Sequence, residues 1–464
     1  MSETDTQTSD LLEAFPPANP TRISSAIFAL LCIIPMFATV LFGAVDSATW
    51  VILTIFWAML VLLWLCESWS TGNIVFSKSN LQRPLLALLF LGISQLLPLR
   101  FSADTTLANA STAVSLDPYA TQLFVVRLIV FLTFFACSLT FINSEKRLKR
   151  IVILLIIFGA TMAFFGILQR LANPDGIYGM RLTPQAIPFG SFVNQHHFAA
   201  LMQMTGGLTL ALLLGPDTAR EKKYLLAIAL VVSGVAVALT GSRGGLLGFL
   251  AMSGFVAILS FVSGRKKRSE TDGASSQRTI VLVGGALAFG LVVIGTALLI
   301  GGNDQVLRGI GAVSADADVS TGRLHFWPIA LKMFWANPAL GVGFDAFGAA
   351  FTRYDTWRGL MRVEQAHNEY LQMLAEGGIV AIVCVAAFIA LLFRKGLAIV
   401  SSATGFRQSA AIGALAGCVG IMVHSFFDFP LRTNSNMFVF LLLAAIATVT
   451  VVTDEHQKRR HRCH

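Results

Sequence analysis

Residues 24–43, SSAIFALLCIIPMFATVLFG, form a run of twenty residues without a single charged side chain. A helix rises about 1.5 Å per residue, so this run predicts a helix about 30 Å long, the thickness of a bilayer's hydrocarbon core. The whole chain has the same character. Hydrophobic residues make up 55% of its 464 residues and charged residues only 13%. That charged share is about half of what soluble proteins carry, so soluble enzymes and disordered proteins are excluded.

Eleven further apolar runs follow the first one. With it, we place the predicted spans near residues 24–43, 49–66, 84–98, 121–142, 151–168, 197–214, 223–240, 245–263, 279–301, 378–393, 408–427 and 436–453. The sequence therefore predicts an all-α polytopic membrane protein with about 12 transmembrane helices.

The distribution of Lys and Arg predicts the orientation of these spans. If the N-terminus is cytoplasmic, the inside segments hold 22 of these residues and the outside segments 11. Basic residues gather in cytoplasmic loops, so this bias places both termini inside. It also explains the net charge of +9 without a nucleic-acid partner. The expected order is a cytoplasmic tail (1–23), nine spans (24–301), an external loop (302–377), three spans (378–453) and a basic cytoplasmic tail (454–464).

The external loop is too long for a simple connection between two spans. Residues 324–336, LHFWPIALKMFWA, predict an amphipathic helix that Asn337 and Pro338 terminate. Residues 364–376, EQAHNEYLQMLAE, predict a second helix that runs into the tenth span. The loop is therefore expected to be partly helical.

Three basic groups on the external side are candidates for chemistry. Arg243 lies in the turn TGSRGG at 240–245, where glycines allow backbone N–H groups to approach an anion that Arg243 holds bidentately. Arg323 precedes the predicted loop helix, and His367 precedes the tenth span. Simpler interpretations exist, because a lone arginine can anchor lipid phosphate and a surface histidine is usually solvated.

Other polar patterns have ordinary interpretations. Asp316 and Asp318 match a DxD metal motif, but a solvated loop explains them. The run from Asn194 to His197 predicts an interfacial helix start better than a metal site, because no third ligand is near in sequence. We expect no metal and no cofactor. Arg127 lies within a span, where it is either functional or snorkels to the outer headgroups.

Five motifs together resemble the O-antigen ligase and O-antigen polymerase superfamily of bacterial membrane glycosyltransferases. They are GSFVNQHHFAALM (190–202), TGSRGG (240–245), GRLHFWPIALKMFWANPALGVGFDAFG (322–348), HNEYLQMLAEGGIVA (367–381) and HSFFDFPLR (424–432). The resemblance covers most of the chain beyond about residue 120. It departs from the family at position 196, where His stands in place of the expected Asn.

The resemblance implies an inverting transfer on the periplasmic side of the bacterial cytoplasmic membrane. The donor would be a glycan on undecaprenyl diphosphate, and the acceptor a sugar hydroxyl on a glycan or lipid-linked molecule. His367, Arg243 and Arg323 would be the catalytic residues. Substrate binding would involve Ser242, Gly244, Asn368, Asn194, His197, Arg181 and Asp428.

Several functions remain open at this point. The ligase type is preferred, and a polysaccharide polymerase or a protein O-oligosaccharyltransferase would carry the same motifs. A transporter or flippase for an anionic or lipid-linked solute is the alternative from another class. No Asp or Glu lies in the middle of a predicted span, whereas coupled transporters usually need one there. This favours the transferase.

Overall fold

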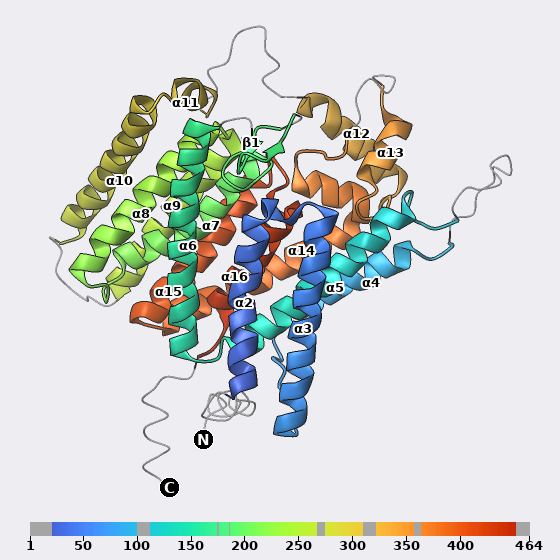
Figure 1. The fold of residues 1–464 in the computed structure, drawn as a ribbon, viewed down its shortest axis with the longest axis horizontal. Coiled ribbons are helices and arrows are strands. Elements are labelled where there is room, and N and C mark those ends of the chain that lie inside the picture. Colours follow the sequence, from blue (N-terminus) through green and yellow to red (C-terminus); the bar gives the residue numbers. More distant parts are fainter. Residues whose placement is uncertain are drawn as a thin grey trace.

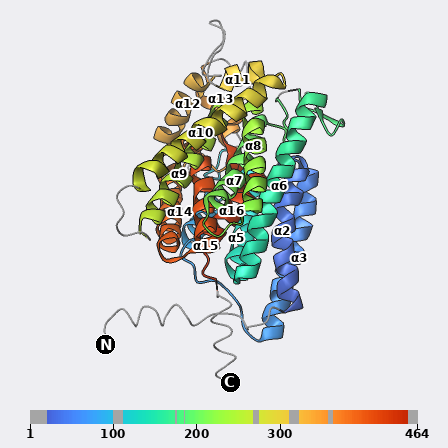
Figure 2. The same ribbon diagram turned by 90° about the vertical axis from the view of Figure 1, so that its left-hand side faces the viewer.

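The computed structural model describes residues 21–99, 112–173, 176–184, 186–266, 274–309, 322–356 and 363–451. In these residues the long helices pack side by side in one bundle (Figures 1 and 2). The elements are α2 (Arg22–Val40), η1 (Phe42–Ala44), α3 (Ser47–Thr71), α4 (Gln82–Gln95), α5 (Pro118–Phe141), α6 (Glu145–Ala172), β1 (Gly176–Ile177), β2 (Arg181–Leu182), α7 (Gln195–Leu214), α8 (Arg220–Thr240), α9 (Arg243–Lys266), α10 (Ala274–Leu299), α11 (Asn303–Gly309), α12 (Arg323–Ala336), α13 (Phe347–Tyr354), α14 (Glu369–Ser402), α15 (Gly405–His424), η2 (Pro430–Arg432) and α16 (Asn434–Thr448).

The helices confirm the predicted fold class. Among the described residues, nine helices are long and apolar enough to cross a membrane, namely α2, α3, α5, α6, α7, α8, α9, α14 and α15. The other three predicted spans fall on α4, α10 and α16, whose described apolar parts are shorter. Each predicted span therefore coincides with a helix, and the chain is an all-α multi-pass membrane protein.

The centre of the bundle is the contact between α7 and α15. The apolar stretches of α7 and α15 are 83% and 67% buried inside the protein, whereas the apolar stretch of α3 is only 17% buried. Glycines allow the close approach: a Cβ on Gly207 would lie 2.6 Å from the carbonyl oxygen of Gly413 and 2.8 Å from the nitrogen of Gly417. Small residues at such spacing are typical of tightly packed membrane helices.

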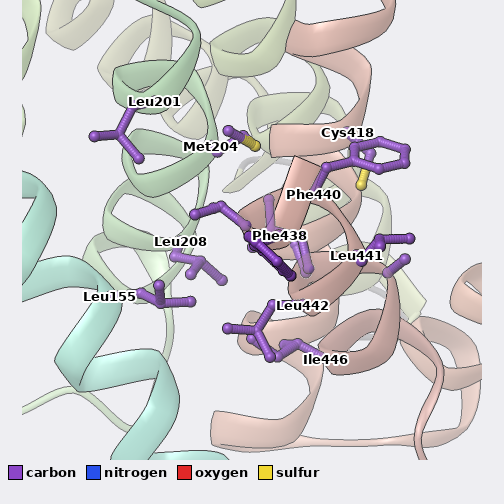
Figure 3. Close-up of a cluster of buried hydrophobic side chains, with 14 of the residues drawn as sticks. Leu155, Leu201, Met204, Leu208, Cys418, Phe438, Phe440, Leu441, Leu442 and Ile446 are labelled. Carbon is purple, nitrogen blue, oxygen red and sulfur yellow. The ribbon is translucent and has the colours of Figure 1, made fainter. Parts of the chain in front are cut away.

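Helix α16 completes this core. Figure 3 shows its side chains, among them Phe438 and Leu442, beside the face of α7 that carries Leu201, Met204 and Leu208. These residues are at most 1% exposed. The last described helix therefore packs directly against a helix from the middle of the chain, which fixes the relative positions of the loops at their ends.

The predicted external loop lies at one end of the bundle, where α11, α12 and α13 gather (Figures 1 and 2). Helix α12 confirms the helix predicted at 324–336, with Asn337 as its C-cap. The helix predicted at 364–376 begins only at Glu369, because His367 has a φ of +51° and Asn368 caps α14. It then continues into the tenth span as predicted, with a break at Gly378, whose φ is +63°. The sequence did not predict α11 or α13.

Candidate functional site

The TGSRGG turn is a short connection that starts α9 at Arg243. Gly241 closes α8 with a φ of +62°, which a residue without Cβ adopts easily. The Ser242 hydroxyl then accepts a hydrogen bond from the Gly245 N–H at 3.0 Å. A Cβ on Gly244 would lie 2.8 Å from His424 Cδ2 and 3.0 Å from Phe427 Cβ. Glycine at position 244 thus allows this turn to pack against the end of α15.

Arg323 approaches the same place from α12. Its Nε and Nη2 donate to the carbonyl oxygen of Phe427 at 3.2 and 2.8 Å. Phe427 is also the residue that Gly244 packs against. The segment after α15 therefore links Arg323 to the TGSRGG turn, although the two are eighty residues apart in sequence.

Asp428 holds the imidazole of His367. Its Nδ1 donates to Asp428 Oδ1 at 3.1 Å, and its side chain remains 34% exposed while that of Asp428 is 2% exposed. Phe429 contacts the imidazole edge to face, with ring centroids 5.0 Å apart. The Asn368 side chain accepts from the N–H groups of Tyr370 and Leu371 and so caps α14. This leaves an accessible imidazole whose orientation a buried carboxylate controls.

Asp428 is an anion in this arrangement. Burial by itself would raise the pKa of its carboxyl group, but the hydrogen bond from His367 and the neighbouring His196 and His197 lower that pKa below its usual range. A charged carboxylate next to Nδ1 favours the tautomer that has its second ring nitrogen, Nε2, available for chemistry.

His196 is a site residue that sequence reasoning missed. Its Nδ1 lies 2.7 Å from the Ser242 hydroxyl. The charges of Asp428, Arg323 and Arg243 all act on its ring, as does His367. The structure therefore brings all three predicted catalytic residues together around His196. The signal that might have revealed it is its place in the first turn of α7, beside the Asn194 cap.

Four helix N-termini meet at this cluster. Arg243 and Arg323 are the first residues of α9 and α12, and His196 is the second residue of α7. His367 lies two residues before α14. The N-terminal end of a helix carries a partial positive charge, so these helices and the two guanidiniums together favour a bound anion.

The comparisons with known proteins match one segment of the chain to a family. Residues 228–386 match the family described as O-antigen ligase. The predicted resemblance to the O-antigen ligase and polymerase superfamily is confirmed. No curated protein matches the chain. The O-antigen ligase segment contains Arg243, Arg323 and His367, and the family is one of glycosyltransferase-type membrane enzymes of polysaccharide biosynthesis.

Two predicted substrate-binding residues before the O-antigen ligase segment have structural contacts. Asn194 caps α7 by accepting from the His196 N–H at 2.8 Å, which agrees with the helix start predicted for this run. His197 is buried, and its Nδ1 bonds the Thr433 hydroxyl.

Arg181 has its contacts apart from the cluster of Arg243, Arg323 and His367. Arg181 forms an ion pair with Asp46 and stacks over Phe42. Its contacts in the described structure are thus away from the arginines and His367. Asp316 and Asp318 lie outside the described residues. Within the part of the chain that is described, no three His, Cys, Asp or Glu side chains are grouped to hold a metal ion.

A cluster of ion pairs adjoins the His367–Asp428 pair. Arg432 bonds Asp345 Oδ1 and Glu376 Oε2, both at 2.6 Å, and Glu369 Oε1 at 3.2 Å. Burial opposes the charged form of Arg432, but these three carboxylates raise its pKa above the usual range. Because Glu369 lies two residues after His367 and Arg432 four after Asp428, the cluster fixes both halves of the His367–Asp428 pair.

Arg127 is part of this cluster. Its Nη1 lies 3.1 Å from Asp345 Oδ2, and its guanidinium lies 5.9 Å from the centre of the Trp50 ring. Arg127 therefore has a carboxylate partner within the bundle, and its place in a span does not require contact with lipid headgroups. Sequence reasoning could not identify its partner, since Asp345 is 218 residues away in the chain.

Replacing Arg432 by Met is expected to destabilise the protein by about 3–5 kcal/mol, because the buried Glu376 and the partly buried Glu369 would lose their cation. Asp345 would keep only its contact with Arg127. Arg127→Met is the matched control; it removes one contact from a side chain that is 34% exposed and should cost much less. Thermal unfolding of the purified protein in detergent measures both. Adding Glu376→Gln to Arg432→Met should restore part of the loss, and equal melting temperatures for Arg432→Met and the parent would contradict the prediction.

An apolar groove of about 190 Å³ adjoins the Arg432 ion cluster. Helices α4, α5, α14, α15 and α16 line it, and its charged residues are Arg127, Asp345, Glu369 and Arg432. The Glu369 N–H donates to the Ser425 carbonyl at 2.9 Å, and both residues line the groove. The lining residues on α14 run from Glu369 to Ile389.

Proposed function

We propose that this protein is an inverting glycosyltransferase that moves a glycan from undecaprenyl diphosphate to a sugar hydroxyl at the periplasmic face of the bacterial inner membrane. One observation carries the proposal: Arg243 and Arg323 begin helices, His367 lies two residues before one, and all three act electrostatically on the same ring, that of His196. Two arginines and the helix ends suit a diphosphate, and a histidine suits a hydroxyl.

The proposed reaction is a single displacement. Nε2 of His367 takes the proton of the acceptor hydroxyl, while Asp428 holds Nδ1 and stabilises the positive charge that the ring gains. The acceptor oxygen bonds the anomeric carbon from the face opposite the diphosphate. The bond from that carbon to the diphosphate oxygen breaks, and its electron pair leaves with the diphosphate. Arg243 and Arg323 stabilise the charge that develops there. Attack from the opposite face inverts the configuration.

The membrane bundle supplies a place for the lipid part of a substrate. The groove beside the Arg432 cluster is lined mostly by apolar side chains, and its charged lining residues include Glu369, two residues after His367. An isoprenoid chain that lies among the spans would leave its head at the level of the site. We propose the ligase type, in which the acceptor is a lipid-linked glycan.

Purified protein tests the function directly. Incubated in detergent with an undecaprenyl-diphosphate glycan and a candidate acceptor, it should form transferred product without a transmembrane gradient. A pure transporter or flippase cannot do this. Deletion of the gene separates the family's activities: long chains left on the lipid carrier indicate a lost ligase, and single repeat units a lost polymerase. If glycoproteins of the deletion strain lose their glycan, the lost activity is that of an O-oligosaccharyltransferase.

The site must also lie outside the cytoplasm. From the charge bias we expect tags at residue 270 and at the C-terminus to report cytoplasmic, and a tag at residue 315 to report periplasmic. Protease or fluorescence reporters on the tagged chain measure this. A cytoplasmic tag at residue 315 would place Arg323 and His367 on the wrong side of the membrane and contradict the proposed donor.

A further inference from the structure

We infer that His196 is a further ligand of the leaving diphosphate, to which its Nε2–H donates a hydrogen bond. This inference rests on the proposed function, and it adds a neutral donor to the two arginines. The evidence is the fixed position of the ring, the Ser242 hydroxyl that contacts its Nδ1, and the charged side chains around it.

The backbone that carries His196 is fixed against α9. A Cβ on Gly245 would lie 2.7 Å from Ala199 Cβ, so the first turns of α7 and α9 are in close contact. The Gln203 side-chain amide donates to the Gly245 carbonyl at 2.8 Å. Asn194 accepts the His196 N–H at 2.8 Å. These contacts hold the imidazole beside the turn that carries Arg243.

The contact with Ser242 is the basis for assigning the ring proton. The Ser242 hydroxyl oxygen accepts from the Gly245 N–H at 3.0 Å. His196 Nδ1 lies 2.7 Å from that oxygen, and we assign the hydroxyl proton to this contact, with Nδ1 as its acceptor. A neutral imidazole that accepts at Nδ1 has its hydrogen on Nε2. His196 therefore presents an N–H donor on the side of the ring away from Ser242.

The surroundings of that donor fit an anion. Arg243, Arg323 and His367 act electrostatically on the His196 ring, as does Asp428, and His197 and His424 lie nearby. Asp428 already holds His367. The two histidines therefore have separate tasks: His367 acts on the acceptor hydroxyl, and His196 binds the group that departs.

The step needs no proton from His196. The acceptor proton goes to His367, the electron pair of the broken bond goes to the diphosphate oxygen, and His196 remains neutral while its hydrogen bond to that oxygen shortens. A donor that binds more strongly as charge develops lowers the barrier.

Two near-isosteric substitutions test this assignment. The side-chain amide nitrogen of Gln reaches the position of Nε2, and that of Asn reaches the position of Nδ1. We expect His196→Gln to retain transfer within about tenfold of the parent, and His196→Asn and His196→Ala to lose about 100-fold or more, as when one oxyanion donor is removed. Farnesyl diphosphate, a short isoprenoid diphosphate, provides a second readout: its Kd should rise severalfold in Asn and Ala and little in Gln.

The opposite order would overturn the inference. If Asn matches the parent while Gln fails in transfer and in farnesyl diphosphate binding, His196 serves only to hold Ser242. Unchanged transfer by all three variants would also overturn it. His367→Ala, measured in parallel, tests the proposed function separately from the inference about His196. If His367→Ala loses transfer and the His196 variants do not, only the inference fails; if His367→Ala also transfers normally, the proposed function fails.

Discussion

Replacing His367 by Ala is expected to lower the rate of glycan transfer by about 100- to 10,000-fold, the range in which general acid–base catalysis acts. The acceptor hydroxyl would lose the group that removes its proton. Donor binding should persist, because the arginines and the helix N-termini remain in place. Transfer by purified variants, together with binding of farnesyl diphosphate, measures the two effects separately.

His325 provides the matched control for this experiment. It lies on α12 and pairs with Asp355 at 2.9 Å, so it has a carboxylate partner as His367 does. His325→Ala should retain most of the transfer activity. Asp428→Asn should fall between His367→Ala and the parent, since it keeps the shape of the partner but not its charge. Near-normal transfer by correctly inserted His367→Ala would exclude His367 as the base.

Replacing Arg243 or Arg323 by Lys is expected to lower transfer by about 100- to 1,000-fold, equal to about 2.7–4 kcal/mol of lost transition-state stabilisation. An ammonium group keeps the charge but does not reproduce a planar two-pronged contact with a phosphate. Arg323 has a second task, because its Nε and Nη2 hold the Phe427 carbonyl. We therefore expect Arg323→Lys to weaken binding of farnesyl diphosphate as well as turnover.

Arg353→Lys is the matched control, because it replaces a guanidinium by an ammonium at the same end of the bundle but outside the proposed site. Arg353 lies in the last turn of α13 and is exposed. Its substitution should leave transfer unchanged within about threefold. Should Arg243→Lys, Arg323→Lys and Arg353→Lys all behave like the parent at equal expression, the anion site would have to lie elsewhere.

The fold could be predicted because the bilayer imposes a simple rule on sequence. A spanning helix needs about 20 apolar residues, and such runs are visible without knowledge of tertiary contacts. Helix α12 was visible for a similar reason, since Asn337 and Pro338 mark its end. Helix α13 has only eight residues, Phe347–Tyr354, and so few residues do not predict a helix by their apolar spacing alone.

The site was only partly predictable because its contacts span large sequence separations. The glycines beside Arg243 and the helix start at Arg323 are local signals. The pairing of His367 with Asp428 joins residues 61 positions apart, and that of His196 with Ser242 joins residues 46 apart. Nothing local distinguishes His196 from His197, yet one ring adjoins the arginines and the other is buried against Thr433. Only the packing of α7 against α9 and α15 separates them.

The place of Asp428 in the chain has a consequence for biosynthesis. The site needs α7, α9, α12 and α14, but His367 has no carboxylate partner and Arg323 no carbonyl anchor until the segment after α15 has been made. Ribosomes make this segment after every other part of the site. A nascent chain that has not reached it can therefore insert the earlier helices without a complete site. Under the proposed function, such a chain would not yet act on lipid-linked glycan.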